Sequence, residues 1–223
     1  GGFVGVDVFF VISGYLITTI LIEDIENKRF SIVNFYERRA RRILPALFFV
    51  MFITVLPAYF VMLPDELQNF GQSLVATTFF VNNVLLGLTT DYWALEAEYK
   101  PLMHTWSLGI EEQYYLLFPF FLTLTWKFGK EKVFWMIVVL TIFSLLLSEW
   151  GWRKEPTLNY YLSPARAWEL FAGSLAAFFV YKNGVKNNNV LALFGLAGIL
   201  FSIFFYDENT PFPSIYAAVP VIG

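Results

Sequence analysis

Long apolar runs alternate with short polar connections along the chain. The runs are of the length needed to cross the hydrocarbon core of a bilayer as a helix, about 17 to 25 residues. They lie at about 5–22, 44–62, 69–88, 107–127, 133–149, 165–181 and 190–205, and another begins near 214. Because stretches such as 48–53 do not alternate between apolar and polar positions, the pattern predicts helices rather than barrel strands. We expect an all-α, polytopic transmembrane helical bundle.

The composition agrees with a chain surrounded by lipid. Apolar residues make up 57% of the 223 residues and aromatic residues 20%, whereas only 15% are charged, against about 25% in soluble domains. So many apolar side chains cannot all be kept from water in a soluble fold, which excludes a soluble enzyme. The formal net charge is −3. This balance provides no overall basic surface, so we expect a lipid bilayer, and no nucleic acid, as partner.

Two residue counts limit metal and thiol chemistry. The sequence has no cysteine and a single histidine, His104. Disulfides, thiolate zinc sites, iron–sulfur clusters and sites built on a histidine pair are therefore excluded, and we expect no metal site.

The two ends of the chain indicate a fragment. The sequence starts with Gly1 rather than methionine and stops at Gly223 inside an apolar run. We expect a single integral-membrane domain, 1–223, that is incomplete at both ends.

Basic residues indicate the membrane topology. The connection 23–42 holds six of the 15 lysines and arginines, whereas the turn at 63–66 has none. The positive-inside rule places the first in the cytoplasm and the second outside. If every later run crossed the membrane in turn, the three lysines within 127–132 would lie on the outer face, against the positive-inside rule. We therefore expect either 69–88 or 107–127 to be re-entrant rather than a simple span.

Polar residues inside the first run need a reason, because a charge at the bilayer centre costs about 2.5 to 3.5 kcal/mol on insertion scales. Asp7 is followed by Ser13 and Gly14, whose small size allows a backbone or a ligand to approach closely. Asp7 either belongs to a site or caps a helix near the interface. Ser13 and Gly14 are either part of that site or a packing notch.

Four arginines fall within the five positions 38–42, just before the second run. Arg38 and Arg42 are four residues apart and share a helical face, with Arg39 and Arg41 beside it. Guanidinium groups bind phosphate bidentately, which suits coenzyme A or the head of a lipid-linked sugar. The alternative is a topology signal that also contacts anionic lipids.

Two adjacent carboxylates, Glu111 and Glu112, enter an apolar run just after the histidine. If the helix already includes His104, the 100° step per residue puts His104, Glu111 and Tyr115 on one interior face. A buried glutamate can act as general acid or base, or can orient an imidazole. The alternative is a helix that starts at Ser107, with both carboxylates near its positive end and His104 at the interface.

Two further polar pairs lie inside runs. Arg166 and Glu169 are spaced for an ion pair between positions i and i+3 at a helix start. Asn82 and Asn83 either form hydrogen bonds to other helices or line a cavity.

These motifs together resemble the membrane-bound acyltransferase family 3, in its bacterial branch of lipopolysaccharide and envelope-glycan O-acetyltransferases. The motifs that carry the resemblance occur in the family's order and cover most of the chain: they are Gly1–Thr18, Arg38–Pro45, His104–Tyr115 and Arg166–Leu170.

The resemblance implies a multi-pass enzyme of the bacterial cytoplasmic (inner) membrane. It would take an acetyl group from acetyl-CoA and deliver it to a sugar hydroxyl of an envelope glycan, such as lipopolysaccharide O-antigen, or of a lipid-linked sugar. By the same resemblance the donor's phosphates would face Arg38, Arg39 and Arg42. The adjacent channel would be lined by Asp7 and the segment 13–16, including Ser13 and Tyr15.

The family's proposed catalytic histidine lies on a helix that precedes the segment matching Gly1–Phe3. We therefore expect that residue upstream of residue 1 and expect the fragment alone to be inactive. Glu111 or Glu112 would orient or buffer the proton. His104 is a third catalytic candidate but does not replace the upstream histidine. A transporter of lipid-linked sugars or small anions is the alternative function, with the same charged residues along a translocation path.

Overall fold

The computed structural model describes residues 2–89, 100–185, 188–207 and 210–223, and within these ranges all regular structure is helical. This confirms the all-α prediction. The α-helices are α1 Val4–Glu26, α2 Ile32–Val61, α3 Pro64–Thr78, α4 Asn82–Thr89, α6 Thr105–Thr125, α7 Lys130–Lys154, α8 Pro156–Tyr161, α9 Ser163–Asn183, α10 Asn189–Phe205 and α11 Ala218–Ile222; two 3₁₀ turns are η1 Trp126–Phe128 and η2 Ile215–Ala217.

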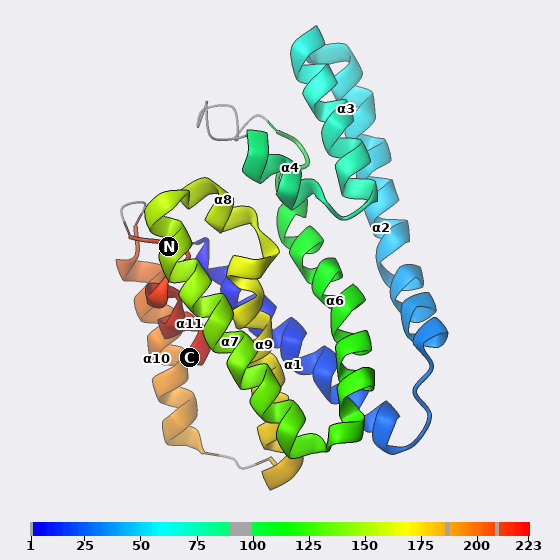
Figure 1. Cartoon of the computed structure of the whole chain (residues 1–223). Helices are drawn as coiled ribbons and strands as arrows, with labels where there is room; N and C mark the ends of the chain where they lie inside the picture. The colour runs from blue at the N-terminus through cyan, green and yellow to red at the C-terminus, as the bar shows by residue number, and fades with distance from the viewer. Residues whose placement is uncertain (1, 90–99, 186–187, 208–209) are drawn as a thin grey trace.

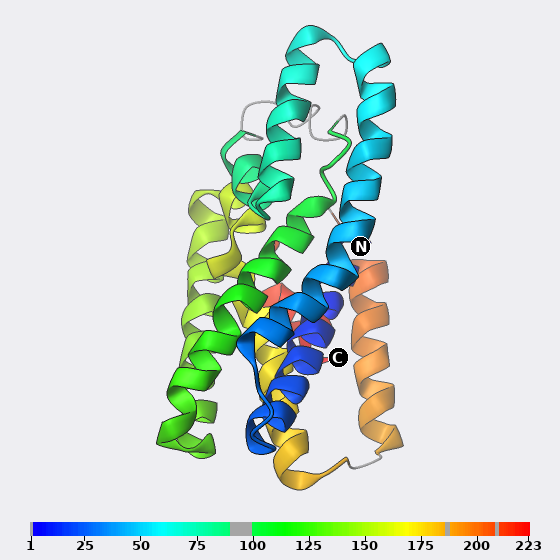
Figure 2. The same ribbon diagram turned by 90° about the vertical axis from the view of Figure 1, so that its right-hand side faces the viewer.

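Helices α1, α9 and α7 pack side by side and form the main body, with α6 against them (Figure 1). Helices α2 and α3 form an antiparallel pair that extends beyond this body (Figure 2), and α10 lies at the edge opposite α2 (Figure 1). Helix α1 contacts both α9 and α6 in this arrangement.

Two glycines let α1 and α9 approach closely. A Cβ atom on Gly14 would collide with the carbonyl of Leu170, and one on Gly173 would collide with the carbonyl of Val11. Small residues at a helix crossing are typical of bundles in lipid, where close backbone packing replaces the hydrophobic effect as the attraction. Of the two roles left open for Gly14, the structure therefore supports close packing between helices.

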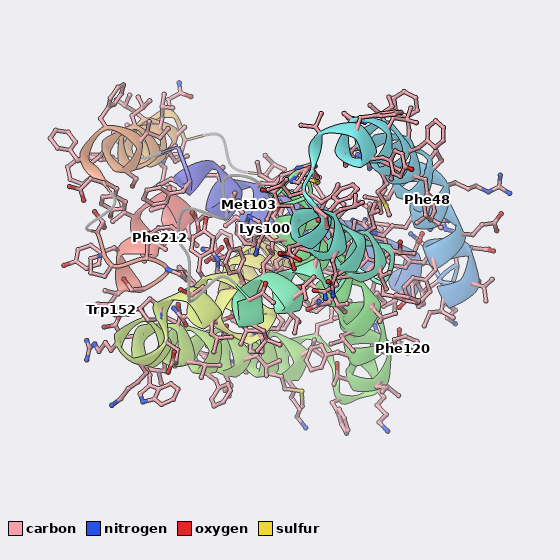
Figure 3. The ribbon with its side chains drawn as sticks, turned by 90° about the horizontal axis from the view of Figure 1, so that it is seen from above. Phe48, Lys100, Met103, Phe120, Trp152 and Phe212 are labelled. Carbon is pink, nitrogen blue, oxygen red and sulfur yellow. The ribbon has the colours of Figure 1, made fainter. Side chains whose placement is uncertain are left out.

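Three helices, α1, α2 and α7, are long and apolar enough to cross a membrane by length and composition. Helices α6 and α9 have 21 residues each, about 31 Å at 1.5 Å per residue, and they carry buried charges. Large apolar side chains such as Phe48 and Phe120 point outward from the bundle (Figure 3). Such an exterior suits lipid, as the composition predicted.

Helix α2 is longer than the apolar run inside it. It begins at Ile32, where the Ser31 side chain accepts a hydrogen bond from the Asn34 amide, and it continues through Pro45 and Pro57. The arginine segment 38–42 therefore belongs to the same helix as the predicted span 44–62. A hydroxyl cap before a helix-forming polar segment explains the early start.

The predicted continuous span 69–88 is wrong. Helix α3 ends at Thr78, and the chain turns through Phe80, whose φ of 56° is in the left-handed region that bulky residues rarely adopt. The side-chain amide of Gln113 donates to the Phe80 carbonyl at 2.9 Å, and α4 then starts at Asn82. The break agrees with the expectation that one segment between 69 and 127 is not a simple span.

Candidate active site

One guanidinium joins two carboxylates where α1, α2 and α6 meet. Arg39 of α2 places Nε 3.1 Å from Oε1 of Glu112 and Nη2 3.6 Å from Oε1 of Glu111. Its guanidinium carbon lies 3.1 Å from the centre of the Tyr115 ring. We call Arg39, Glu111 and Glu112 the open cluster, because the Arg39 side chain remains 17% exposed. Helix α6 presents both carboxylates to one cation from α2.

Glu111 is further held by two hydroxyl groups. Ser13 of α1 donates to Glu111 Oε1 at 2.5 Å, and the Tyr115 hydroxyl donates to the same oxygen. Hydrogen bonds to a carboxylate are stronger than neutral ones and stabilise the ionised form. Oε2 has no hydrogen-bond partner among the described residues. One oxygen of Glu111 is therefore held by two hydroxyl groups.

A cavity of about 240 Å³ borders the open cluster. Its walls combine polar groups of α2 and α6 with apolar side chains; they are Tyr36, Arg39, Ala40, Ile43, Leu44, Phe79, Phe80, Glu112, Gln113, Tyr115 and Leu116. Glu112 lines the cavity directly, whereas Glu111 lies between α1 and α6 beside it. The sequence predicted Glu111 and Tyr115 on one interior face, and the structure joins them there.

His104 lies apart from this site. It occupies the N-cap position of α6 and is exposed. Seven residues separate it from Glu111, about 10 Å along the helix, and no hydrogen bond joins the two side chains within the described part of the chain. His104 is exposed whereas Glu111 is buried, so the two side chains do not share the predicted interior face.

The three arginines that the resemblance places at the donor's phosphates do not all point the same way. Arg38 points outward to Asp24, with Nη2 3.3 Å from Oδ2. Arg42 is exposed and forms no ion pair in the ranges that the structure describes. Arg39 alone turns inward, so the three side chains do not converge on one point.

A second charged group lies deep between α1 and α9. Arg166 Nη1 is 2.6 Å from Asp7 Oδ1 and 2.8 Å from Glu169 Oε1, and all three side chains are 0% exposed. We call Asp7, Arg166 and Glu169 the sealed cluster. The predicted pair between Arg166 and Glu169 is confirmed. Asp7 pairs with Arg166 and with none of the described arginines of 38–42, so its place in a channel beside them stays a prediction.

Aromatic rings enclose the sealed cluster. The rings of Phe10, Trp106, Tyr160 and Phe212 lie 5.1 to 5.8 Å from the Arg166 guanidinium carbon. Burial raises the pKa of Tyr160, so its hydroxyl remains protonated. The pairing of Asp7 with Arg166 was missed from the sequence, although opposite charges inside two apolar runs were a usable signal.

The neighbouring polar residues form bonds between helices. Asn83 Nδ2 donates to the Tyr161 carbonyl at 3.0 Å, and Asn82 Nδ2 donates to the Thr105 hydroxyl at 2.8 Å. Gln113 donates to Asn83 Oδ1 at 2.9 Å. Of the two roles left open for the asparagines, the structure therefore supports hydrogen bonding across helices. Tyr15 of α1 is half-buried.

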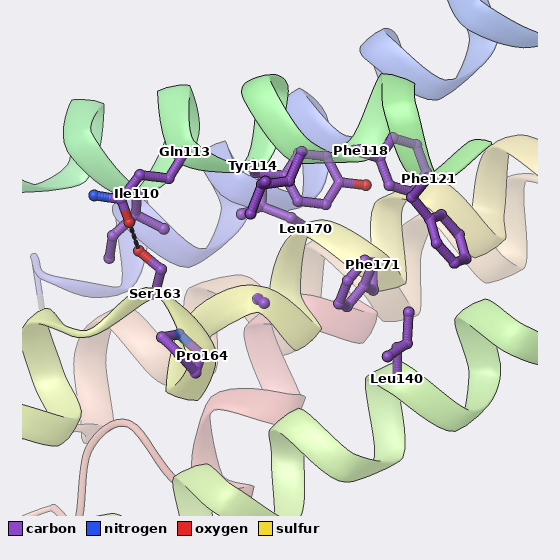
Figure 4. A pocket seen from close by; sticks show the side chains of 12 residues that line it. Ile110, Gln113, Tyr114, Phe118, Phe121, Leu140, Ser163, Pro164, Leu170 and Phe171 are labelled. Carbon is purple, nitrogen blue, oxygen red and sulfur yellow. Dashed lines mark hydrogen bonds between the residues drawn. The ribbon is translucent and has the colours of Figure 1, made fainter. Parts of the chain in front are cut away.

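A different cavity, of about 410 Å³, lies between α6, α7 and α9 (Figure 4). Its walls are apolar except at one end, where Ser163 donates to Gln113 (Figure 4). It contains no charged side chain. Among the described residues, no group of three His, Cys, Asp or Glu side chains could hold a metal ion. The cavity beside the open cluster is therefore the candidate active site.

Comparisons with known proteins agree with these features. A protein family described as an acyltransferase domain matches residues 1–222. An uncharacterized protein of Haemophilus influenzae is 36% identical over 97% of the chain and 94% of its own length. The peptidoglycan O-acetyltransferase OatA of Listeria monocytogenes is 34% identical over 95% of the chain, and the O-acetyltransferase OatA of Staphylococcus aureus is 32% identical over 92%.

The chain spans 36% of the length of each of these two OatA proteins. No solved structure matches it. The family match covers nearly every residue, so the chain belongs to the acyltransferase domain family.

Proposed function

We propose that this member of the acyltransferase domain family moves an acetyl group from acetyl-CoA to a sugar hydroxyl of a cell-envelope polysaccharide. The observation that carries the proposal is Glu111, a carboxylate fixed through one oxygen beside a cavity with polar and apolar walls. The names of the Listeria and Staphylococcus relatives support O-acetyl transfer. Peptidoglycan and lipopolysaccharide O-antigen are both acceptors of the proposed class.

In the proposed reaction, the acceptor hydroxyl oxygen bonds to the acetyl carbonyl carbon, and the bond from that carbon to the sulfur of coenzyme A breaks. The hydroxyl proton passes to Glu111 Oε2 and ends on the departing thiolate. General acid–base assistance of this kind contributes about 10²- to 10⁴-fold to a rate. Arg39 and Tyr115 keep the carboxylate in place while the proton moves.

The donor's phosphates are assigned to Arg38 and Arg42 on the outer side of α2. Both side chains are exposed, and both belong to the basic connection 23–42 that is predicted to be cytoplasmic. A cytoplasmic position gives access to acetyl-CoA. We therefore propose a multi-pass protein of the bacterial inner membrane that takes its donor from the cytoplasm.

Paired substitutions in the full-length protein test the proposal. Glu111→Gln keeps size and removes the proton acceptor, so we expect it to abolish most transfer while expression is retained. Glu112→Gln removes the closer partner of Arg39, so we expect lower thermal stability with transfer largely retained. Acetyl-CoA consumption and acetylated glycan are measured in membrane vesicles.

An inactive, stable Glu112→Gln protein together with an active Glu111→Gln protein would show that the other carboxylate does the chemistry. Movement of a lipid-linked sugar or an anion without acyl transfer by the wild type would favour a transporter instead.

A further inference from the structure

The arginines of α2 differ sharply in their surroundings. Arg38 and Arg41 have side chains that are 62% and 78% exposed, whereas the Arg39 side chain is 17% exposed. Arg41 pairs with Glu37 one turn earlier at 2.9 Å. Adjacent positions of one helix therefore place one guanidinium inside the protein and the others at its surface.

The bonds of Arg39 leave little freedom for a phosphate. Its Nε bonds to Glu112, its Nη2 lies near Glu111, and its flat face covers the Tyr115 ring. To present its Nε/Nη2 edge to a phosphate, the guanidinium would have to turn away from both carboxylates. Two mostly buried negative charges would then lie side by side without a cation, which is unfavourable.

We infer that Arg39 is a positioning residue for Glu111 and Glu112 and does not bind the donor. It places a positive charge against both carboxylates and orients them, while Arg38 and Arg42 bind the phosphates. The inference rests on the proposed function for its catalytic meaning, and on the contacts of Arg39 alone for the positioning.

Steady-state kinetics of the detergent-purified full-length protein separate the two roles. We expect Arg39→Gln to lower kcat by about 10- to 100-fold, as for the loss of a charge-assisted contact, with the KM for acetyl-CoA changed less than about twofold. Arg42→Gln should raise that KM severalfold with kcat nearly unchanged. Arg39→Lys, with one compact charge in place of the fork, should recover part of kcat. Arg41→Gln is the matched control and should change neither parameter.

A second measurement does not depend on activity. Dicyclohexylcarbodiimide modifies protonated carboxyl groups in apolar surroundings, and the modified glutamate is identified by mass spectrometry. We expect labelling of Glu111 and Glu112 to rise severalfold in Arg39→Gln and to stay at the wild-type level in Arg41→Gln.

A raised KM with retained kcat in Arg39→Gln, or unchanged labelling of both glutamates, would overturn the inference. If the wild type transfers no acetyl group, the proposed function fails, and the labelling result alone decides whether Arg39 positions the carboxylates.

Discussion

The sealed and open clusters have the same charged groups and opposite surroundings. Each combines one arginine with two carboxylates, and each includes a contact to α1. The sealed cluster is 0% exposed and walled by aromatic rings, whereas the open cluster is partly exposed and borders a cavity. The residue types alone do not distinguish a structural ion cluster from a reactive one.

Access and partners make the difference. In the sealed cluster the charges have only one another, so removing one leaves the rest unpaired in an apolar interior. In the open cluster, Arg39 and Glu112 line a cavity, through which the proposed mechanism brings a proton to Glu111. Asp7 and Ser13 are six residues apart on α1, about 9 Å, so one helix supports both arrangements.

The largest effect is expected at the centre of the sealed cluster. Arg166→Ala leaves Asp7 and Glu169 buried without a cation, which should destabilise the fold by about 3 to 5 kcal/mol. We expect little monodisperse protein and a strongly lowered Tm in detergent, measured by fluorescence-detected size exclusion and thermal unfolding. Arg39→Ala, the matched change in the open cluster, should cost clearly less stability.

Arg166→Lys keeps the charge but loses the planar guanidinium that can bond two carboxylates at once. Its Tm should lie between those of Arg166→Ala and the wild type. A wild-type Tm for Arg166→Ala would show that the two clusters do not differ in the way proposed.

A smaller effect is expected where α1 crosses α9. Gly14→Ala adds a methyl group that meets the Leu170 carbonyl, and overpacking of this kind costs about 1 to 3 kcal/mol. Gly5→Ala on the same helix meets no atom within 4 Å and serves as the control. Thermal unfolding should show a lower Tm for Gly14→Ala only; equal Tm values for the two variants would contradict the close crossing.

The smallest effect is expected at the surface of α2. The pair of Arg41 and Glu37 joins side chains that are 78% and 53% exposed, and exposed pairs one turn apart contribute about 0.3 to 0.5 kcal/mol. Arg41→Gln should therefore leave Tm and acetyl transfer nearly unchanged. A loss of transfer in this variant would mean that the surface arginines do more than bind the donor's phosphates through Arg38 and Arg42.

Local pattern was enough to predict the helices that run uninterrupted. The runs at 5–22, 133–149 and 190–205 lie within α1, α7 and α10, because an unbroken apolar run satisfies its backbone hydrogen bonds only within its own helix. The prediction of a continuous helix over 69–88 failed for a non-local reason. Asn82 and Asn83 find their partners on α6 and at the end of α8, and the chain bends to reach them.

The sequence by itself determined the all-α membrane architecture, the family and the local pair of Arg166 with Glu169, because composition, motif order and an i,i+3 spacing are readable along one dimension. Only the tertiary structure decided that Asp7 completes the sealed cluster, that Arg39 turns toward Glu111 and Glu112, and that His104 lies apart from them. Arg39 and Glu112 are 73 positions apart in the sequence, and Asp7 and Arg166 are 159 apart. A buried charge requires a partner, and only the packing of the helices determines which one lies within reach.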